Sequence, residues 1–220
     1  MTSKQLLLDL PIRTARGRDD FFVAPSNELA VKKIDDYQNW AGRKLVLAGP
    51  KGSGKSHLVG VWSDLTHAQI VEADKCKDAL QEGPMAVENV DLILGDRELE
   101  EALFHLHNCV LSQGHPFLMT VSELPERLDF SLPDLKSRVL AADLVRLGEP
   151  DDALLAVVLV KLFADRQLHV EPDVIKFLIT RIDRSFADAE RVVAMLDEAS
   201  MMQRKPITVR FAGGLLKSQS

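Results

Sequence analysis

The sequence predicts an α/β fold: a five-stranded parallel sheet with helices on both faces, followed by a small C-terminal helical lid. Three observations support this prediction. Short apolar segments alternate with helix-like segments between residues 45 and 147, a pattern typical of parallel sheets covered on both sides. A glycine-rich loop separates the first apolar segment from its helix. After Pro150 the strand-like segments give way to a series of long helical ones.

The elements follow in order. A first helix is expected to begin after Ser26 or Asn27, since either residue can cap it. The expected strands are residues 45–48, 69–73, 85–89, 116–121 and 143–147. The expected helices of this part are residues 55–65 and 98–113, and those of the lid are residues 151–166, 171–182 and 184–202. A short strand is expected at residues 207–209.

Composition limits the possible functions. The chain has 220 residues, of which 46% are hydrophobic, so one α/β domain with a small appendage can bury a core. Its net charge of -6 argues against sequence-independent DNA binding, which needs clustered Lys and Arg. The cysteines, Cys76 and Cys109, lack metal-ligand spacing and are expected to be reduced thiols. Without a signal peptide or an apolar stretch of about 20 residues, we expect a cytoplasmic protein that is not membrane-bound.

The strongest motif is residues 49–56, Gly-Pro-Lys-Gly-Ser-Gly-Lys-Ser. Such a loop, placed between a strand and a helix, directs backbone N–H groups at phosphate oxygens. Lys55 is expected to reach the outer phosphates, and Ser56 to help hold Mg²⁺. The predicted cofactor is therefore ADP or ATP with Mg²⁺. The predicted nucleotide-binding residues here are Gly49, Pro50, Lys51, Gly52, Ser53, Gly54, Lys55, Ser56 and His57.

Four stretches, residues 21–30, 49–56, 101–108 and 132–138, resemble the DnaA-related AAA+ family, and within it the Hda-like regulators. The resemblance implies a nucleotide-binding subdomain at residues 21–150 and a lid at residues 151–220. It also implies that Phe22 and Val23 lie near the adenine and that Ser122 occupies a sensor position. Arg138, in the box Leu-Pro-Asp-Leu-Lys-Ser-Arg, is implied to be an arginine finger that acts on the ATP of DnaA.

The expected metal-binding position departs from the family pattern. The chain has Glu88-Asn89 at the end of the third strand. The initiators have Asp-Asp there, and the Hda-like pattern is similar to Asp-Asn. Glu88 keeps a carboxylate that can hold Mg²⁺ together with Ser56, whereas Asn89 cannot act as a base. Asp91 would share the strand face of Asn89 and lie farther along. Weak or absent intrinsic hydrolysis, with ADP as the resting ligand, is therefore expected.

The lid departs as well, because Ala187 stands where the family has a phosphate-sensing arginine. Arg184 and Arg191 are candidate replacements, and a solvated charge on a helix face is the alternative for each. Whether either residue acts at the nucleotide is left open by the sequence.

The N-terminal segment, residues 1–20, resembles the peptide by which Hda-like proteins bind the β subunit of the DNA polymerase III sliding clamp. The residues that carry the resemblance are Gln5, Leu6, Leu8 and Leu10. An extended peptide can insert alternate apolar side chains into a groove, although the same tract can instead pack on its own domain. The short tail after Met202 and the acidic charge favour an Hda-like regulator over the initiator itself.

The expected function is negative regulation of replication initiation through DnaA. The alternative is an autonomous P-loop ATPase of the helicase-loader or kinase type. The sequence leaves the oligomeric state open, and a homo-oligomer is possible.

Overall fold

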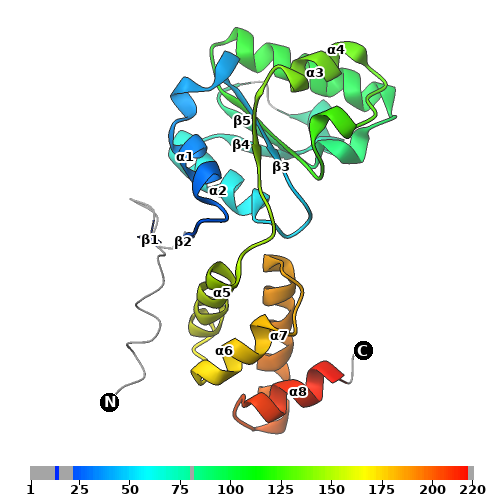
Figure 1. Cartoon of the computed structure of the whole chain (residues 1–220). Helices are drawn as coiled ribbons and strands as arrows, with labels where there is room; N and C mark the ends of the chain where they lie inside the picture. Colours follow the sequence, from blue (N-terminus) through cyan, green and yellow to red (C-terminus); the bar gives the residue numbers. More distant parts are fainter. Residues whose placement is uncertain (1–12, 15–21, 80–81, 218–220) are drawn as a thin grey trace. The chain divides into compact units, whose positions relative to one another are not determined.

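The computed structural model describes residues 13–14, 22–79 and 82–217 (Figure 1). The chain divides into two compact units. One unit is Asn27–Gly148, and the other combines Met1–Ser26 with Glu149–Ser220. No helix of the described residues is both long and apolar enough to cross a membrane.

The first unit is built on a five-stranded sheet in the order β4-β5-β6-β3-β7. The strands are β3 (Lys44–Ala48), β4 (Gln69–Glu72), β5 (Met85–Glu88), β6 (Phe117–Val121) and β7 (Asp143–Arg146). Every neighbouring pair is parallel, so the carboxyl ends of all five strands lie at one edge. The predicted parallel sheet is therefore confirmed.

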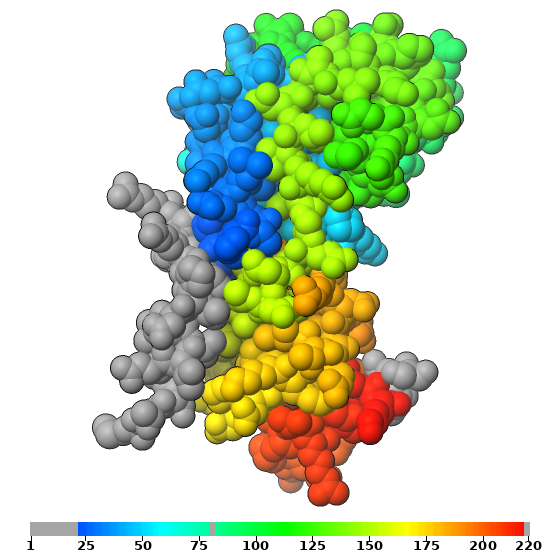
Figure 2. Space-filling model, viewed as in Figure 1, coloured from blue at the N-terminus to red at the C-terminus, as the bar shows by residue number. Residues whose placement is uncertain are grey.

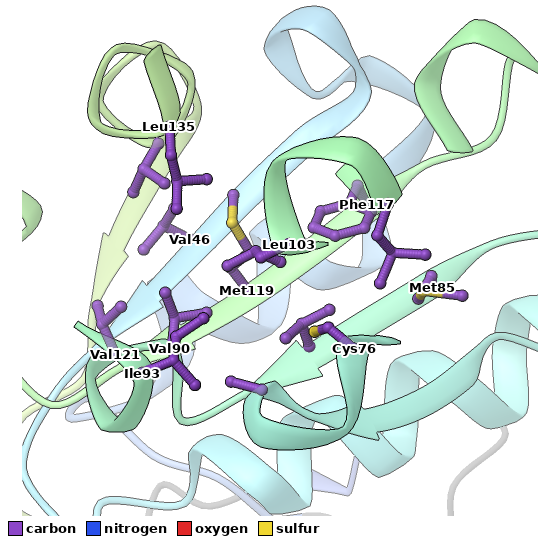
Figure 3. Packing of buried hydrophobic residues seen from close by; sticks show 14 of the residues in the cluster. Val46, Cys76, Met85, Val90, Ile93, Leu103, Phe117, Met119, Val121 and Leu135 are labelled. Atoms are coloured by element: carbon purple, nitrogen blue, oxygen red, sulfur yellow. The ribbon is translucent and has the colours of Figure 1, made fainter. Parts of the chain in front are cut away.

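Helices cover both faces of this sheet, as predicted (Figure 1). On one face, α3 (Arg97–Ser112) and α4 (Pro133–Leu140) pack on a cluster that includes Val46, Met119 and Leu135 (Figure 3). On the other face lie α1 (Glu28–Asp35) and α2 (Lys55–Thr66), near which Trp40 stacks on Trp62 at 5.4 Å between ring centroids. All of β3 is buried, as expected for a central strand covered on both sides.

Short 3-10 helices complete this unit. They are η1 (Tyr37–Asn39), η2 (Ala41–Arg43), η3 (Ala73–Asp78), η4 (Val90–Ile93) and η5 (Pro125–Arg127). Asn89 has a left-handed backbone with φ 58, which ends β5 at Glu88 and starts η4. The expected strand 85–89 is therefore one residue too long. Helix α4 itself was not predicted from the sequence.

The described residues of the second unit form the lid and a short strand pair. The helices are α5 (Asp152–Asp165), α6 (Pro172–Ile179), α7 (Phe186–Gln203) and α8 (Val209–Lys217). The strand expected at residues 207–209 is wrong: Ile207 is buried in the lid core, and Thr208 Oγ1 accepts a hydrogen bond from the N–H of Phe211 at the start of α8. Strand β2 (Phe22–Val23) pairs antiparallel with β1 (Arg13–Thr14) and lies against α5.

Side chains fill the spaces between the ribbons within each unit (Figure 2). In the lid, the apolar faces of the four helices meet in one cluster that includes Leu159, Leu178 and Leu196. Each unit therefore has its own hydrophobic core, as a separate domain requires.

Candidate functional site

The glycine-rich loop joins the end of β3 to the start of α2, as predicted. Gly52 and Gly54 have φ values of 79 and 95, which side-chain-bearing residues rarely adopt. A Cβ atom on Gly49 would lie 2.4 Å from the carbonyl oxygen of Leu147 and 2.9 Å from Ser53 Oγ. The loop is thus packed tightly on the chain after β7. It leads to first-turn N–H groups of α2 that have no intrahelical acceptor and favour an anion.

Lys55 holds its ammonium group over this loop. Its Nζ donates to the carbonyl oxygens of Gly49 at 2.6 Å and Pro50 at 2.9 Å. Burial lowers the pKa of Lys55, and the negative charges of Asp91 and Glu88 partly oppose this shift. Lysine, carboxylates and loop therefore meet at the carboxyl edge of the sheet, where ligands of open α/β sheets bind.

Glu88 ends β5 and is buried. Its Oε1 atom makes no hydrogen bond with any described residue. Ser56, in the first turn of α2, is exposed. A carboxylate and a hydroxyl are oxygen ligands of the kind that Mg²⁺ uses beside nucleotide phosphates, so these residues suit the expected metal.

Asn89 faces away from this lysine–carboxylate group. Its side-chain amide donates to Glu72 Oε2 at 2.9 Å, at the end of β4, and its backbone N–H donates to Thr120 Oγ1 at 2.9 Å. The left-handed turn at Asn89 therefore directs this residue to the two neighbouring strands. Its amide is already engaged there.

Asp91 lies differently from the sequence-based expectation. It does not share a strand face with Asn89, because the strand has ended and Asp91 sits on η4. Its Oδ1 accepts a hydrogen bond from the backbone N–H of Ser122 at 2.9 Å. The turn at Asn89 thus brings Asp91 back toward Lys55. An Asn before a Val-Asp-Leu-Ile segment was the only sequence signal of this turn, since Asn tolerates left-handed angles.

Ser122 follows β6 and is exposed. Through its backbone it joins the end of β6 to Asp91. A sensor would use the hydroxyl of this residue, and that role remains a prediction.

Arg138 lies away from the loop. It sits in the last turn of α4 and is exposed, and its guanidinium forms no ion pair within the described part of the chain. Its carbonyl oxygen accepts a hydrogen bond at 2.8 Å from Nζ of Lys44, the first residue of β3. The loop follows the other end of that strand, roughly 13 Å away at about 3.3 Å per residue. The structure therefore does not bring Arg138 together with Lys55.

Two buried groups of the same unit have shifted pKa values. Burial lowers the pKa of His107 to about 4, with the positive charges of Lys44 and Arg138 also lowering it against an opposing hydrogen bond to Asn108. His107 is therefore neutral at pH 7. Burial and the charge of Asp74 raise the pKa of the Cys76 thiol to about 12. Cys76 and Cys109, both among the described residues, do not form a disulfide, as predicted.

Several predicted site residues belong to the other unit. Phe22 and Val23 form β2 and are half-buried. Ala187 is exposed on α7. Nearby, Arg184 pairs with Asp152 at 2.8 Å, and Arg191 pairs with Asp188 at 2.7 Å. Arg184 precedes α7 rather than lying on it.

The predicted clamp-binding residues Gln5, Leu6, Leu8 and Leu10 lie outside the described residues.

Comparisons with known proteins agree with this architecture. Residues 152–216 match the family model described as the Hda lid domain. An uncharacterized protein of Haemophilus influenzae is 26% identical over 182 residues, covering 76% of this chain and 79% of that protein.

Solved structures show the same fold. Domain III of the replication initiation protein DnaA from Thermotoga maritima superposes with a TM-score of 0.77 at 18% identity, covering 90% of this chain and 94% of that one. AMPPCP-bound DnaA from Aquifex aeolicus gives a TM-score of 0.67 at 16% identity, covering 80% of this chain and 63% of that one. The described residues therefore share their fold with these DnaA structures.

Proposed function

We propose that the chain is an Hda-like, DnaA-related AAA+ protein, and that it is a nucleotide-dependent regulator of replication initiation that promotes ATP hydrolysis by DnaA. The observation that carries this proposal is the position of Arg138. It is exposed on a helix anchored at the edge of the sheet opposite the chain's own phosphate loop. An arginine placed in this way would serve a second protein's site rather than its own.

The chain's own site would hold ADP or ATP through residues 49–57. Lys55 already lies over the loop, where exchanging loop carbonyls for phosphate oxygens needs only a side-chain rotation. Glu88 and Ser56 would hold Mg²⁺, which would neutralise part of the phosphate charge. The AMPPCP in the DnaA structure of Aquifex aeolicus, a protein of the same fold, supports a nucleotide in this loop.

Intrinsic hydrolysis would be weak. A hydrolytic AAA+ site usually needs a carboxylate that orients the attacking water. Asn89 follows Glu88 here, and its amide is bonded to Glu72. Weak contacts to the γ-phosphate would give ATP little more affinity than ADP, so ADP is the expected resting ligand.

Arg138 would act in trans. Its guanidinium would approach the transferred phosphoryl group of ATP bound to DnaA and neutralise the charge that develops there, an effect worth roughly 10³–10⁵ in rate. Water attacks the γ-phosphorus, and ADP–DnaA and phosphate are the products. A lysine at this position would lack the planar fork of donors that suits phosphoryl oxygens.

The N-terminal residues Gln5, Leu6, Leu8 and Leu10 would bind the sliding clamp. Binding of this kind would bring Arg138 to DnaA at replicating DNA and raise its effective concentration there. The partners are thus DnaA and the polymerase III clamp, in the cytoplasm, without direct sequence-specific DNA binding.

An omission experiment tests this proposal. Phosphate release is measured in a mixture of ATP–DnaA, clamp loaded on DNA and the purified chain, and each component is then left out in turn. We expect hydrolysis only in the complete mixture. Hydrolysis by the chain alone at the same rate would instead support the alternative, an autonomous P-loop ATPase of the helicase-loader or kinase type. The grouping of Lys55 with Glu88 and Asp91 is the feature that keeps this alternative open.

A further inference from the structure

We propose that two buried side chains of opposite charge, Glu100 and Lys44, hold the two ends of α4 and thereby fix the position of Arg138. The inference rests on the proposed role of Arg138. Both residues act through the backbone of α4, so they are positioning residues for the arginine.

Glu100 holds the start of the helix. It lies on α3 and is 0% exposed. Its Oε2 accepts the N–H of Leu132 at 2.7 Å, and its Oε1 accepts the N–H of Ser131 at 3.0 Å. Leu132 is the N-cap residue of α4 and has no side chain that can accept a hydrogen bond. The carboxylate of Glu100 thus binds the chain where a capping side chain would normally act.

Lys44 holds the end of the helix. Its side chain is almost fully buried, and its Nζ donates to the Arg138 carbonyl oxygen at 2.8 Å. The N–H groups that follow pair elsewhere, Ala141 with Ser137 and Ala142 with Val139. Carbonyls of a last helical turn lack an intrahelical partner. Lys44 supplies that partner at the very residue that carries the exposed guanidinium.

The two charges match the polarity of the helix. A carboxylate at the N-terminus and an ammonium at the C-terminus both oppose the helix dipole favourably. Helix α4 has only eight residues, too few to be stable alone. Its inward side chains, Leu135 and Val139, fix the rotation of the helix through apolar packing. Directional hydrogen bonds at both ends fix its position along its axis, which apolar packing alone leaves loose.

The test is a double-mutant cycle read out on stimulated hydrolysis of DnaA-bound ATP. Lys44→Met keeps an unbranched side chain that is one atom shorter and removes its donor. We expect this variant to lower kcat roughly tenfold and to leave the KM for DnaA within about threefold. In an Arg138→Ala background, Lys44→Met should cause no further loss, because a residue that acts only through Arg138 has nothing left to position.

A second readout reports on the helix itself. Hydrogen exchange at the α4 amides of residues 136–140 should speed up at least about tenfold in Lys44→Met. The matched control is Lys33→Met, which removes a lysine from a 2.7 Å ion pair with Asp143 in the same unit. That control should change neither kcat nor the exchange of α4. If Lys44→Met does not fold, Glu100→Gln provides the same test at the start of α4.

The outcomes separate the two proposals. If Arg138→Ala keeps full stimulation, the proposed function fails, and the positioning role falls with it. If Arg138→Ala abolishes stimulation while Lys44→Met keeps full kcat, only the positioning role is overturned. An equal loss from Lys44→Met with and without Arg138 would also overturn it, since the lysine would then act by another route.

Discussion

Asp91 Oδ1 accepts a hydrogen bond from the backbone N–H of Ser122 at 2.9 Å. This contact joins the segment after β5 to the end of β6, beside the phosphate loop. It also keeps a carboxylate near Lys55, whose pKa reflects the negative charges of Asp91 and Glu88. The edge of the sheet next to the loop therefore carries two carboxylates and one ammonium group, and each can be tested by substitution.

Glu88 is predicted to bind Mg²⁺. Glu88→Gln keeps the shape of the side chain but removes its charge, so the gain in nucleotide affinity that Mg²⁺ provides should fall by about tenfold, or roughly 1.4 kcal/mol. Affinity in EDTA should stay within about twofold. Calorimetry with and without Mg²⁺ measures both quantities. The control is Glu72→Gln at the end of β4, whose carboxylate binds Asn89. An unchanged Mg²⁺ effect in Glu88→Gln would remove Glu88 from the metal site.

Gly49 is predicted to be required for nucleotide binding. In Gly49→Ala the new Cβ would meet the Leu147 carbonyl oxygen at 2.4 Å, so the loop has to move. Nucleotide affinity should fall by about 100-fold or more, since the loop acts through backbone placement. Gly60→Ala is the matched control, because its Cβ meets nothing within 4 Å on α2. That control should bind nucleotide normally and gain roughly 0.5–1 kcal/mol of stability. Normal binding by Gly49→Ala would show that the loop is not packed as described.

The sheet and the phosphate loop could be predicted because their signals are local. Strand β3 is an unbroken apolar run, and the loop that follows it has a fixed glycine spacing. The turn at Asn89 was missed because a single left-handed residue leaves almost no trace in apolar periodicity. Its consequence, the return of Asp91 to the site, was missed with it.

Helix α4 was missed for a different reason. It has only eight residues, which are too few to show a clear apolar periodicity. The residues that hold it, Glu100 and Lys44, come from positions 32 and 94 residues away from their partners. Contacts of this range depend on the tertiary fold and cannot be inferred from local pattern. The strand expected at residues 207–209 failed for a local reason, since Thr208 caps a helix there.

His107 is predicted to make stability depend on pH. Its folded pKa of about 4 lies below the ordinary value of 6.5, so protonation favours the unfolded chain. The stability that neutral His107 contributes is present above pH 6.5 and is lost as the pH falls toward 4, by at most roughly 3 kcal/mol. Urea unfolding of wild type and His107→Gln at pH 7 and pH 4.5 measures this loss. The variant should lose about 2–3 kcal/mol less.

Exposed His105 provides the control for this prediction. His105→Gln should reproduce the pH dependence of the wild type. Equal losses in wild type and His107→Gln would contradict the argument that His107 is buried as a neutral group.

The N-terminal segment is predicted to bind the sliding clamp through alternate side chains. Replacing Leu8 and Leu10 with Ala should weaken clamp binding by at least about tenfold, because each removes an apolar anchor. Surface plasmon resonance on immobilised clamp measures the affinity. Leu7→Ala is the matched control, since Leu7 would point to the opposite side of an extended bound peptide. This variant should bind within about threefold of wild type. If Leu7→Ala weakened clamp binding as much as the replacement of Leu8 and Leu10, the alternating insertion of side chains would be refuted.

Arg138 is proposed to complete a site on another protein. The most direct test is a single-turnover measurement of ATP hydrolysis on DnaA with clamp-loaded DNA, comparing wild type, Arg138→Ala and the exposed control Arg127→Ala. We expect Arg138→Ala to lose stimulation by roughly 10³-fold while its own nucleotide affinity stays unchanged, and Arg127→Ala to behave as wild type. Full stimulation of DnaA by Arg138→Ala would contradict it.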